Sequence, residues 1–294
     1  MRKLLLPAVL ILALVGCKNP TAQDVAGRVI KGAVTAAPAF FITDKQEVEL
    51  GRQTMAKVLV EMPEFPNPEL RDYVNEVGQK VAAASVGDRE GILYEFRVLH
   101  SAEINAFAAP GGFLFVTTGA LRVMKNEAQL AGVLGHEVAH VAKKHSINGI
   151  QQAMVAQGLI TGALDGNDSK LIESGATIGA SLILKGFGRG QEEESDRLGA
   201  RYAYASGYNP LALGGFLDTL RQTSGEVPNW LVYFSDHPRT DDRLVKIEEY
   251  VTAENMSVAD KQLGEAIFKM KVLDKLAGIA DPAPRPEPEA SEAP

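Results

Sequence analysis

The pentapeptide His-Glu-Val-Ala-His at 136–140 constrains what this chain can fold into more than any other part of its sequence. It lies in a strongly apolar segment that follows Asn126, a good helix N-cap, and that we expect to continue as one helix to about Ile147. Two histidines four residues apart on a helix differ by about 40° in direction and about 6 Å in height. Both imidazoles therefore project from one face and can reach one metal ion.

The residues near these histidines fit a catalytic metal better than two unrelated imidazoles. Glu137 lies one residue further round the helix, where its carboxylate can contact a metal-bound water without being a ligand. The apolar surroundings argue for bound imidazoles, because buried imidazoles without partners are costly. His145 is half a turn out of phase with His136, so we expect it to be a solvated helix residue.

A hydrolytic zinc site needs a third protein ligand and an open coordination position. The acidic segment 192–196 is the best source, although it could also be only an acidic helix start favoured by the helix dipole. Glu192 and Asp196 are four residues apart and share a face with small residues, so their helix could lie against the histidine helix. Asp196 would then hold the N–H of one ligand histidine. We predict one zinc ion per chain, bound by His136, His140 and Glu192.

The remaining pattern predicts an α+β fold that is mainly helical, with a small sheet and a pair of active-site helices. Apolar positions at spacings of three and four predict two helices between Asp44 and Ala84, joined by a proline-rich segment. Strands are expected at 92–99 and 112–118. Further helices are expected at 192–206, 211–221 and 241–251, with a helical hairpin at 150–186.

The amino end has the features of a secretory signal. Arg2 and Lys3 precede an apolar run of 12 residues that is too short to span a bilayer comfortably. The run ends in Leu-Val-Gly-Cys at 14–17, which resembles the lipobox of bacterial lipoproteins and implies lipid attachment to Cys17. By the same resemblance, Lys18 implies the periplasmic side of the outer membrane. The alternative is an ordinary signal peptide with a chance cysteine.

Composition excludes several other classes of protein. The 294 residues carry 30 basic and 37 acidic side chains, so the attraction to phosphate on which nucleic-acid binders depend is missing. A single cysteine excludes an internal disulfide and any zinc site built from several thiolates.

Several separated motifs together resemble the HtpX-like and CAAX-prenyl-protease-related zinc metallopeptidases, in their bacterial periplasmic lipoprotein branch. The resemblance covers about residues 44–250 and implies a zincin-like peptidase in which HExxH is followed by a distant ExxxD. Gly188, Gly190 and Ser195 depart from the commoner family residues but leave the ligands untouched. The matching pieces are QEVELGR at 46–52, NAFAAPGG at 105–112, TTGAL at 117–121, the HExxH helix, residues 187–196, and His237-Pro238 followed by Arg243.

The resemblance also implies roles for individual residues. Glu137 would be the catalytic base. His237 would approach the metal, either as a transition-state donor or as a fourth ligand that closes the site, whereas the alternative is a surface loop histidine. Arg243 would be a transition-state or structural residue, with an ion pair to Asp241, Asp242 or another carboxylate as the alternative.

The expected function is zinc-dependent endopeptidase activity on unfolded or misassembled envelope proteins, with oligomerisation left open. An extended substrate would add to an edge strand by main-chain hydrogen bonds, which read little sequence. We assign that edge to Phe113, Leu114, Phe115 and Val116. The alternatives are a zinc-stabilised, chaperone-like binding module with a self-inhibited site, or a membrane-remodelling protein that uses the 150–186 hairpin.

The chain is expected to divide into five parts: a lipoprotein signal peptide at 1–16, a tether at 17–43, the peptidase domain at 44–255, a helical extension at 256–279 and a disordered proline-, glutamate- and alanine-rich tail at 280–294.

Overall fold

The computed structural model describes residues 41–157, 168–183, 186–223, 237 and 242–282. The expected signal peptide, Cys17 and most of the tether lie outside these residues, as do the middle of the expected hairpin and the tail after Pro282. Within the described part, none of the helices combines the length and the hydrophobicity that a membrane span needs.

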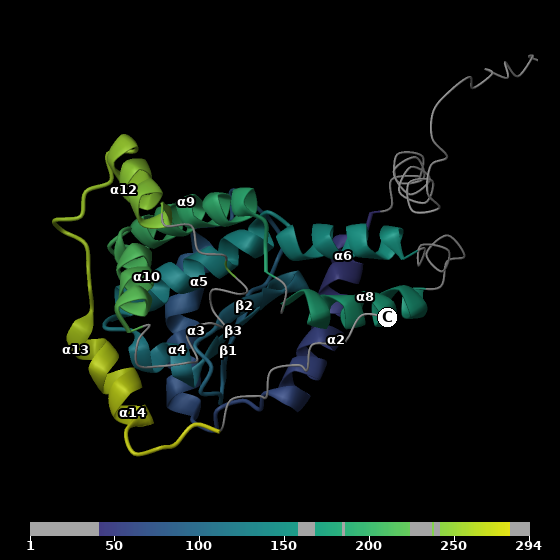
Figure 1. Ribbon diagram of the computed structural model, residues 1–294, viewed down its shortest axis with the longest axis horizontal. Helices are drawn as coiled ribbons and strands as arrows, with labels where there is room; N and C mark the ends of the chain where they lie inside the picture. Colours follow the sequence, from purple (N-terminus) through teal and green to yellow (C-terminus); the bar gives the residue numbers. More distant parts are fainter. Residues whose placement is uncertain (1–40, 158–167, 184–185, 224–236, 238–241, 283–294) are drawn as a thin grey trace, which may run out of the picture. The chain divides into compact units, whose positions relative to one another are not determined.

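The described elements confirm a mainly helical α+β fold with one small sheet (Figure 1). In chain order they are α2 (Asp44–Glu61), α3 (Pro68–Ala83), β1 (Glu95–Leu99), β2 (Ala106–Ala109), η1 (Pro110–Gly112), β3 (Phe113–Thr117), α4 (Thr118–Val123), α5 (Glu127–Ala142), α6 (His145–Ala156), α8 (Asp168–Ile183), α9 (Arg189–Ala205), α10 (Ala212–Thr223), α12 (Arg243–Ala253), α13 (Glu265–Phe268), η2 (Lys269–Leu273) and α14 (Asp274–Leu276).

The sheet has the strand order β1-β3-β2, with β1 parallel and β2 antiparallel to β3. Because β3 is the central strand, the prediction that Phe113, Leu114, Phe115 and Val116 form a substrate-facing edge is wrong. The sequence pattern missed β2 because its four residues, Ala-Phe-Ala-Ala, are all buried and show no alternation.

Helix α5, which carries the pentapeptide, is buried along its whole length and contacts α3, α9, α10 and β2. Asn126 caps it as predicted, since its side chain accepts a hydrogen bond from the backbone N–H of Gln129. The helix ends at Ala142 instead of continuing to Ile147. Lys144 adopts a left-handed conformation with φ of 59°, so α6 starts in a new direction at the next residue.

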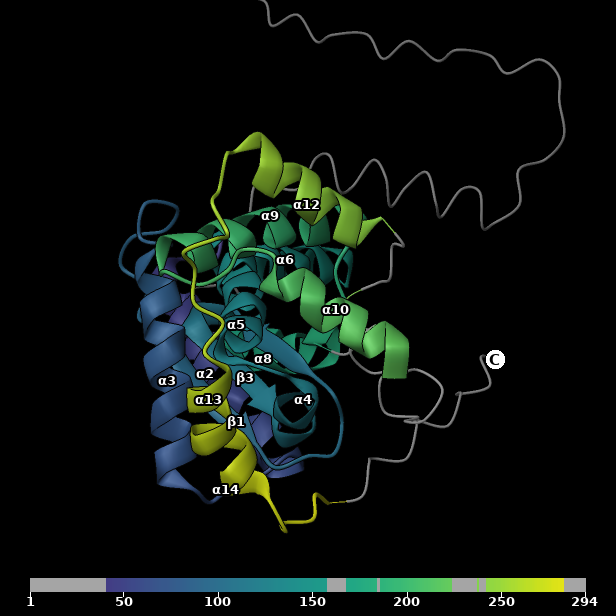
Figure 2. The same ribbon diagram turned by 90° about the vertical axis from the view of Figure 1, so that its left-hand side faces the viewer.

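Helices α5 and α9 lie next to each other (Figure 2). Their closest approach is at a pair of glycines, Gly135 and Gly199. A Cβ atom on Gly199 would lie 2.8 Å from the backbone nitrogen of His136, and one on Gly135 would lie 3.0 Å from the carbonyl oxygen of Gly199. The two backbones are therefore in direct contact, with no room for a Cβ atom at Gly199 and only a tight fit for one at Gly135.

A buried ion pair ties α2 to the end of α5 and to the turn before β3. Glu47 on α2 accepts hydrogen bonds from Arg89, at 2.6 and 3.0 Å, and from the backbone N–H of Gly111, at 3.0 Å. Arg89 also donates to the carbonyl oxygen of Val141, at 2.8 Å. The loop that precedes the central strand is thus fixed to the C-terminal turn of the histidine helix.

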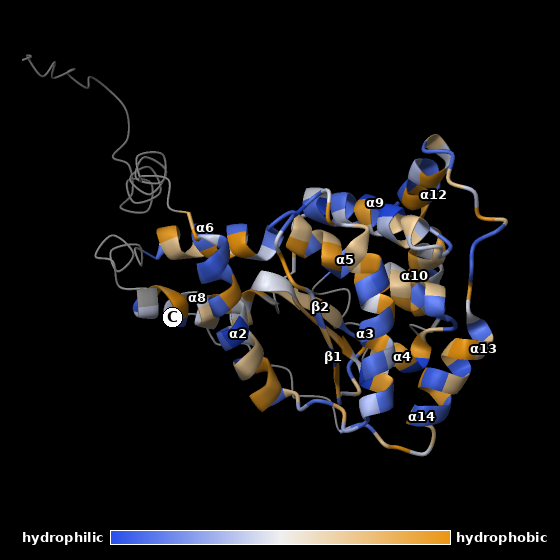
Figure 3. Ribbon diagram, turned by 180° about the vertical axis from the view of Figure 1, so that it is seen from behind, coloured by the Kyte–Doolittle hydropathy of each residue, from blue (hydrophilic) through white to orange (hydrophobic). Residues whose placement is uncertain are grey.

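The described parts of the expected hairpin pack inward. The apolar positions of α6 and α8 (orange in Figure 3) form a second core cluster together with α2. Its fully buried members include Leu50, Ile150 and Met154. These faces are therefore occupied by contacts within the domain, which argues against their use in membrane remodelling.

The helical extension after α12 packs on the domain near α3 and α4 (Figure 2). Phe268, Val272 and Leu276 are fully buried in the main core. Arg122 of α4 donates 2.7 Å to Asp281, a residue at the start of the expected tail. The ordered extension therefore reaches at least to Asp281.

Candidate metal centre

Four buried side chains form a group that can hold a metal ion. His136 and His140 come from α5, Glu192 from the first turn of α9 and His237 from the segment before α12. One potential ligand atom from each lies within 4.8 Å of all the others. The structure thus brings the three predicted ligands together with His237, which the resemblance had implied would approach the metal.

The distances within this group fit zinc. The Nε2 atoms of His136 and His140 are 3.0 Å apart, and Glu192 carboxylate oxygens lie 3.5 Å from each of them. Ligands about 2.0–2.1 Å from a tetrahedral ion are about 3.3 Å from one another. Two imidazoles and one carboxylate at this spacing make the donor set of a catalytic zinc site.

Three neighbouring glutamates on α9 have three different environments. Glu192 is buried and faces the histidines, as the helical phase predicts. Glu193 is exposed and pairs with Lys246 at 3.0 Å. Glu194 lies 3.2 Å from the Nε2 atom of His145. Of the three, Glu192 is therefore the one whose carboxylate the fold directs at both ligand histidines.

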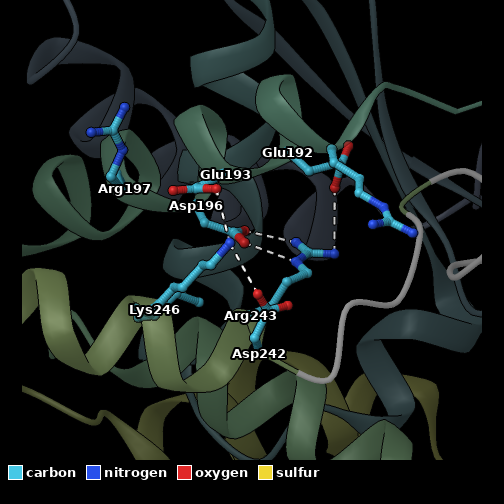
Figure 4. Close-up of a pocket in the computed structure, with 9 residues that line it drawn as sticks. Glu192, Glu193, Asp196, Arg197, Asp242, Arg243 and Lys246 are labelled. Carbon is cyan, nitrogen blue, oxygen red and sulfur yellow. Dashed lines mark hydrogen bonds and ion pairs between the residues drawn. The ribbon is translucent and has the colours of Figure 1, made fainter.

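Asp196 and Arg243 support His136 on the side of its ring that faces away from the other ligands. An Asp196 oxygen lies 2.9 Å from Nδ1 of His136, the ring nitrogen that faces away from the other ligands. Arg243, the first residue of α12, donates two hydrogen bonds to Asp196, at 2.7 and 2.8 Å. Its Nη1 atom is also 3.3 Å from Glu192, so Arg243 lies between both carboxylates (Figure 4).

The charges in this group favour a bound cation. Burial alone would lower the pKa of His136, but the hydrogen bonds and charges of Asp196 and Glu192 outweigh it and raise that pKa to about 10. Burial would raise the pKa of Asp196, yet the Arg243 charge and the His136 hydrogen bond hold it below its usual value. Both carboxylates therefore stay ionised, and metal binding here competes with a proton.

His145 is not the solvated residue that its phase predicted. It is 4% exposed, and its Nδ1 atom lies 2.9 Å from Nδ1 of His140. Because the chain breaks at Lys144, His145 begins a new helix and its ring turns back towards α5. The sequence offered one signal for this, the Lys143-Lys144 pair in an otherwise apolar segment.

Glu137 and His237 face each other beside the ligand group. Glu137 is fully buried, and one of its carboxylate oxygens is 3.4 Å from Nε2 of His237. Nδ1 of His237 lies 3.1 and 3.2 Å from the two oxygens of Glu192. Burial would lower the pKa of His237, but the charges of Glu192 and Glu137 outweigh it and raise the pKa. His237 is thus packed against the ligands and is not a surface loop residue.

The strand nearest to this group is β2. The carbonyl oxygen of Ala106 is 3.3 Å from Nε2 of His237, and that of Ala108 accepts a hydrogen bond from Ser146 at 3.3 Å. These two carbonyls point away from β3, along the outer edge of the sheet. A cavity of about 260 Å³ adjoins this edge, and its wall includes Ala108, His145, Phe187 and His237.

Residues 68–251 match the protein family described as "Peptidase family M48". The chain is 28% identical over 219 residues to the beta-barrel assembly-enhancing protease of Yersinia pestis, covering 71% of this chain and 44% of that protein. It is 30% identical over 179 residues to the mitochondrial metalloendopeptidase OMA1 of Schizosaccharomyces pombe, covering 61% and 52%.

Metalloprotease LoiP of Escherichia coli strain K12 is 25% identical over 264 residues, which cover 87% of this chain and 98% of LoiP. The chain spans about half the length of the other two relatives. Because the family match extends over more than half of the chain and contains both metal-binding helices, the chain belongs to peptidase family M48, and its site is that of a metallopeptidase.

Proposed function

We propose that this protein is a zinc-dependent endopeptidase that cleaves unfolded or misassembled proteins of the bacterial envelope. One observation carries the proposal: the ligand atoms of His136, His140 and Glu192 converge at 3.0–3.5 Å, with the carboxylate of Glu137 beside them. Relatives named as a beta-barrel assembly-enhancing protease and as metalloproteases support both the activity and the envelope setting.

Each residue of the site has its own role in hydrolysis. A zinc ion held there supplies a Lewis acid that polarises the scissile carbonyl and lowers the pKa of water. Glu137 is placed to take a proton from the attacking water and to pass it to the leaving amine. Asp196 fixes the ring of His136, and Arg243 fixes Asp196.

The substrate strand of this proposal is β2 instead of β3. The outer carbonyls of Ala106 and Ala108 lie beside the ligand group, so an extended peptide paired with this edge would pass close to the ion. Such pairing depends on main-chain hydrogen bonds and accepts many side chains. A preference for unfolded chains follows, because a folded protein does not offer a free extended segment.

Location is part of the same proposal. Lipid attached to Cys17 would hold the protein on the periplasmic face of the outer membrane, where misassembled envelope proteins are its substrates. Bacterial relatives named as beta-barrel assembly-enhancing proteases support this setting.

The decisive variant is Glu137→Gln, which removes the base and keeps the shape of the side chain. For the full chain purified in detergent, we expect zinc content to be unchanged and casein hydrolysis to fall by about 10²- to 10⁴-fold. Glu193→Gln makes the same chemical change on an exposed residue and should keep wild-type activity. Equal turnover by the Glu137→Gln protein would refute the proposal.

A second candidate is the zinc-stabilised binding module, which the position of His237 favours. His237 contacts Glu192, Glu137 and the Ala106 carbonyl at once, so its ring covers the place that a substrate would take. The variant His237→Ala separates the two functions. A gain in casein hydrolysis would indicate a regulated peptidase, whereas no hydrolysis by either form would favour a module that only binds.

A further inference from the structure

We infer that His145 and Glu194 form a positioning pair that orients the second zinc ligand, His140. This inference rests on the proposed function, because it concerns the same metal site. Neither is a defining residue of its motif, since His145 follows HExxH and Glu194 occupies a variable position of ExxxD. They come from different helices, since His145 begins α6 and Glu194 lies in the second turn of α9.

The ring nitrogens allow one consistent set of hydrogen bonds. When Nε2 of His140 binds the ion, its Nδ1 carries the proton and donates to Nδ1 of His145, 2.9 Å away. The proton of neutral His145 must then be on Nε2, which is 3.2 Å from a carboxylate oxygen of Glu194. Donors and acceptors therefore alternate from His140 to the Glu194 carboxylate, and no two donors or two acceptors face each other.

The geometry leaves His140 no comparable partner among the described residues. Its Nε2 atom faces His136 and Glu192, and its ring stacks on Phe187 with the ring centres 4.0 Å apart. Stacking fixes the plane of the ring but does not distinguish its two orientations, which differ by a 180° flip. The hydrogen bond from Nδ1 to His145 selects one of them and so directs Nε2 at the ion.

Ser195 adds a weaker contact to the same pair. Its hydroxyl lies 3.5 Å from Nδ1 of His145, at the limit of a hydrogen bond. We therefore assign the positioning of His140 to the His145 and Glu194 side chains, with Ser195 contributing little.

The experiment measures zinc affinity by chelator competition on the full chain in detergent, with kcat and KM for casein as a second readout. His145→Leu removes the acceptor at similar volume, whereas His145→Asn keeps an acceptor near the position of Nδ1. Glu194→Gln removes the charge at the far end of the pair. Glu193→Gln, one residue away on α9, is the matched control.

We expect His145→Leu to weaken zinc binding about 10- to 100-fold and His145→Asn to recover most of that loss. Glu194→Gln should weaken binding several-fold, and Glu193→Gln should leave it unchanged. In zinc-saturated protein, the His145→Leu loss should appear in kcat with little change in KM, because the substrate strand is intact.

Two results would overturn the inference. The first is wild-type zinc affinity in His145→Leu. The second is an equal loss in the Leu and Asn variants, which would mean that packing and not the hydrogen bond matters. If the Leu variant does not fold, Glu194→Gln and His145→Asn still decide the question. Failure of the wild type itself to bind zinc would instead remove the proposed function.

Discussion

The two ligand histidines of α5 are supported in opposite ways. His136 rests on Asp196, which is buried and held by two hydrogen bonds from the equally buried Arg243. His140 rests on His145, whose own partner, Glu194, is 38% exposed. The first support is charged and enclosed by three helices, whereas the second meets His140 through a neutral imidazole and ends at a carboxylate that is partly open to water.

The two supports should therefore affect different properties: one the stability of the fold, the other the orientation of the ligand histidine. Removing one member of a buried ion pair leaves the other charge without compensation, so the Asp196 side should dominate the stability of the fold. A partly exposed carboxylate remains solvated when it loses its partner, so the Glu194 side should matter for the ligand and little for the fold.

The largest effect is expected for Asp196→Ala. This change leaves the buried guanidinium of Arg243 without its bidentate partner and should lower the free energy of unfolding by about 3–5 kcal/mol. Urea unfolding measures it. Because a domain is stable by only about 5–15 kcal/mol, Asp196→Asn, which keeps the shape, serves as the milder form.

Glu194→Ala is the matched change at the more exposed of the two supports. It should lower the free energy of unfolding by less than about 1 kcal/mol. Equal losses for Asp196→Ala and Glu194→Ala would contradict the contrast between the two supports.

Removal of the metal should give the next largest effect. At free zinc 100 times the dissociation constant, bound metal adds about 2.7 kcal/mol to stability, and a chelator should remove it. A His145→Leu protein with tenfold weaker binding should lose only about 1.4 kcal/mol under the same zinc concentration. Thermal unfolding with and without chelator checks both values, and identical losses would mean that His145 does not act through the ion.

The smallest effect is expected for Lys246→Met. Lys246 is exposed and lies close to Arg243, where it pairs with Glu193 and Asp242 at 3.0 Å each (Figure 4). The urea midpoint should stay at the wild-type value, because solvated pairs contribute little. A clear drop in the urea midpoint would contradict the view that Arg243 stabilises the fold because it is buried, whereas Lys246 does not because it is exposed.

Local spacing was enough to find three of the four candidate metal ligands. The 3.6-residue period placed His136 and His140 on one face, and the same rule chose Glu192 over Glu193 and Glu194. Both inferences concern residues within one helix. The structure brings these residues together as their phases predict.

What the sequence could not show depends on contacts between distant segments. The break at Lys144 turns His145 back to His140, and no periodicity predicts one residue in a left-handed conformation. The order of the sheet depends on β2, which is too short and too uniformly buried to be detected. The partner of Arg243 likewise lies 47 residues away, on another helix.

The contact between Gly135 and Gly199 has a consequence for the metal site. His136 follows Gly135 directly, and Glu192 lies two turns before Gly199 on the opposing helix, so the separation of the two backbones sets the distance between the histidines and the carboxylate. An alanine at Gly199 would push α9 away from α5, and Glu192 would move with it. Two imidazoles alone are an incomplete donor set for catalytic zinc, so the affinity for zinc would fall. The absence of a side chain at this contact thus keeps the carboxylate within reach of both histidines.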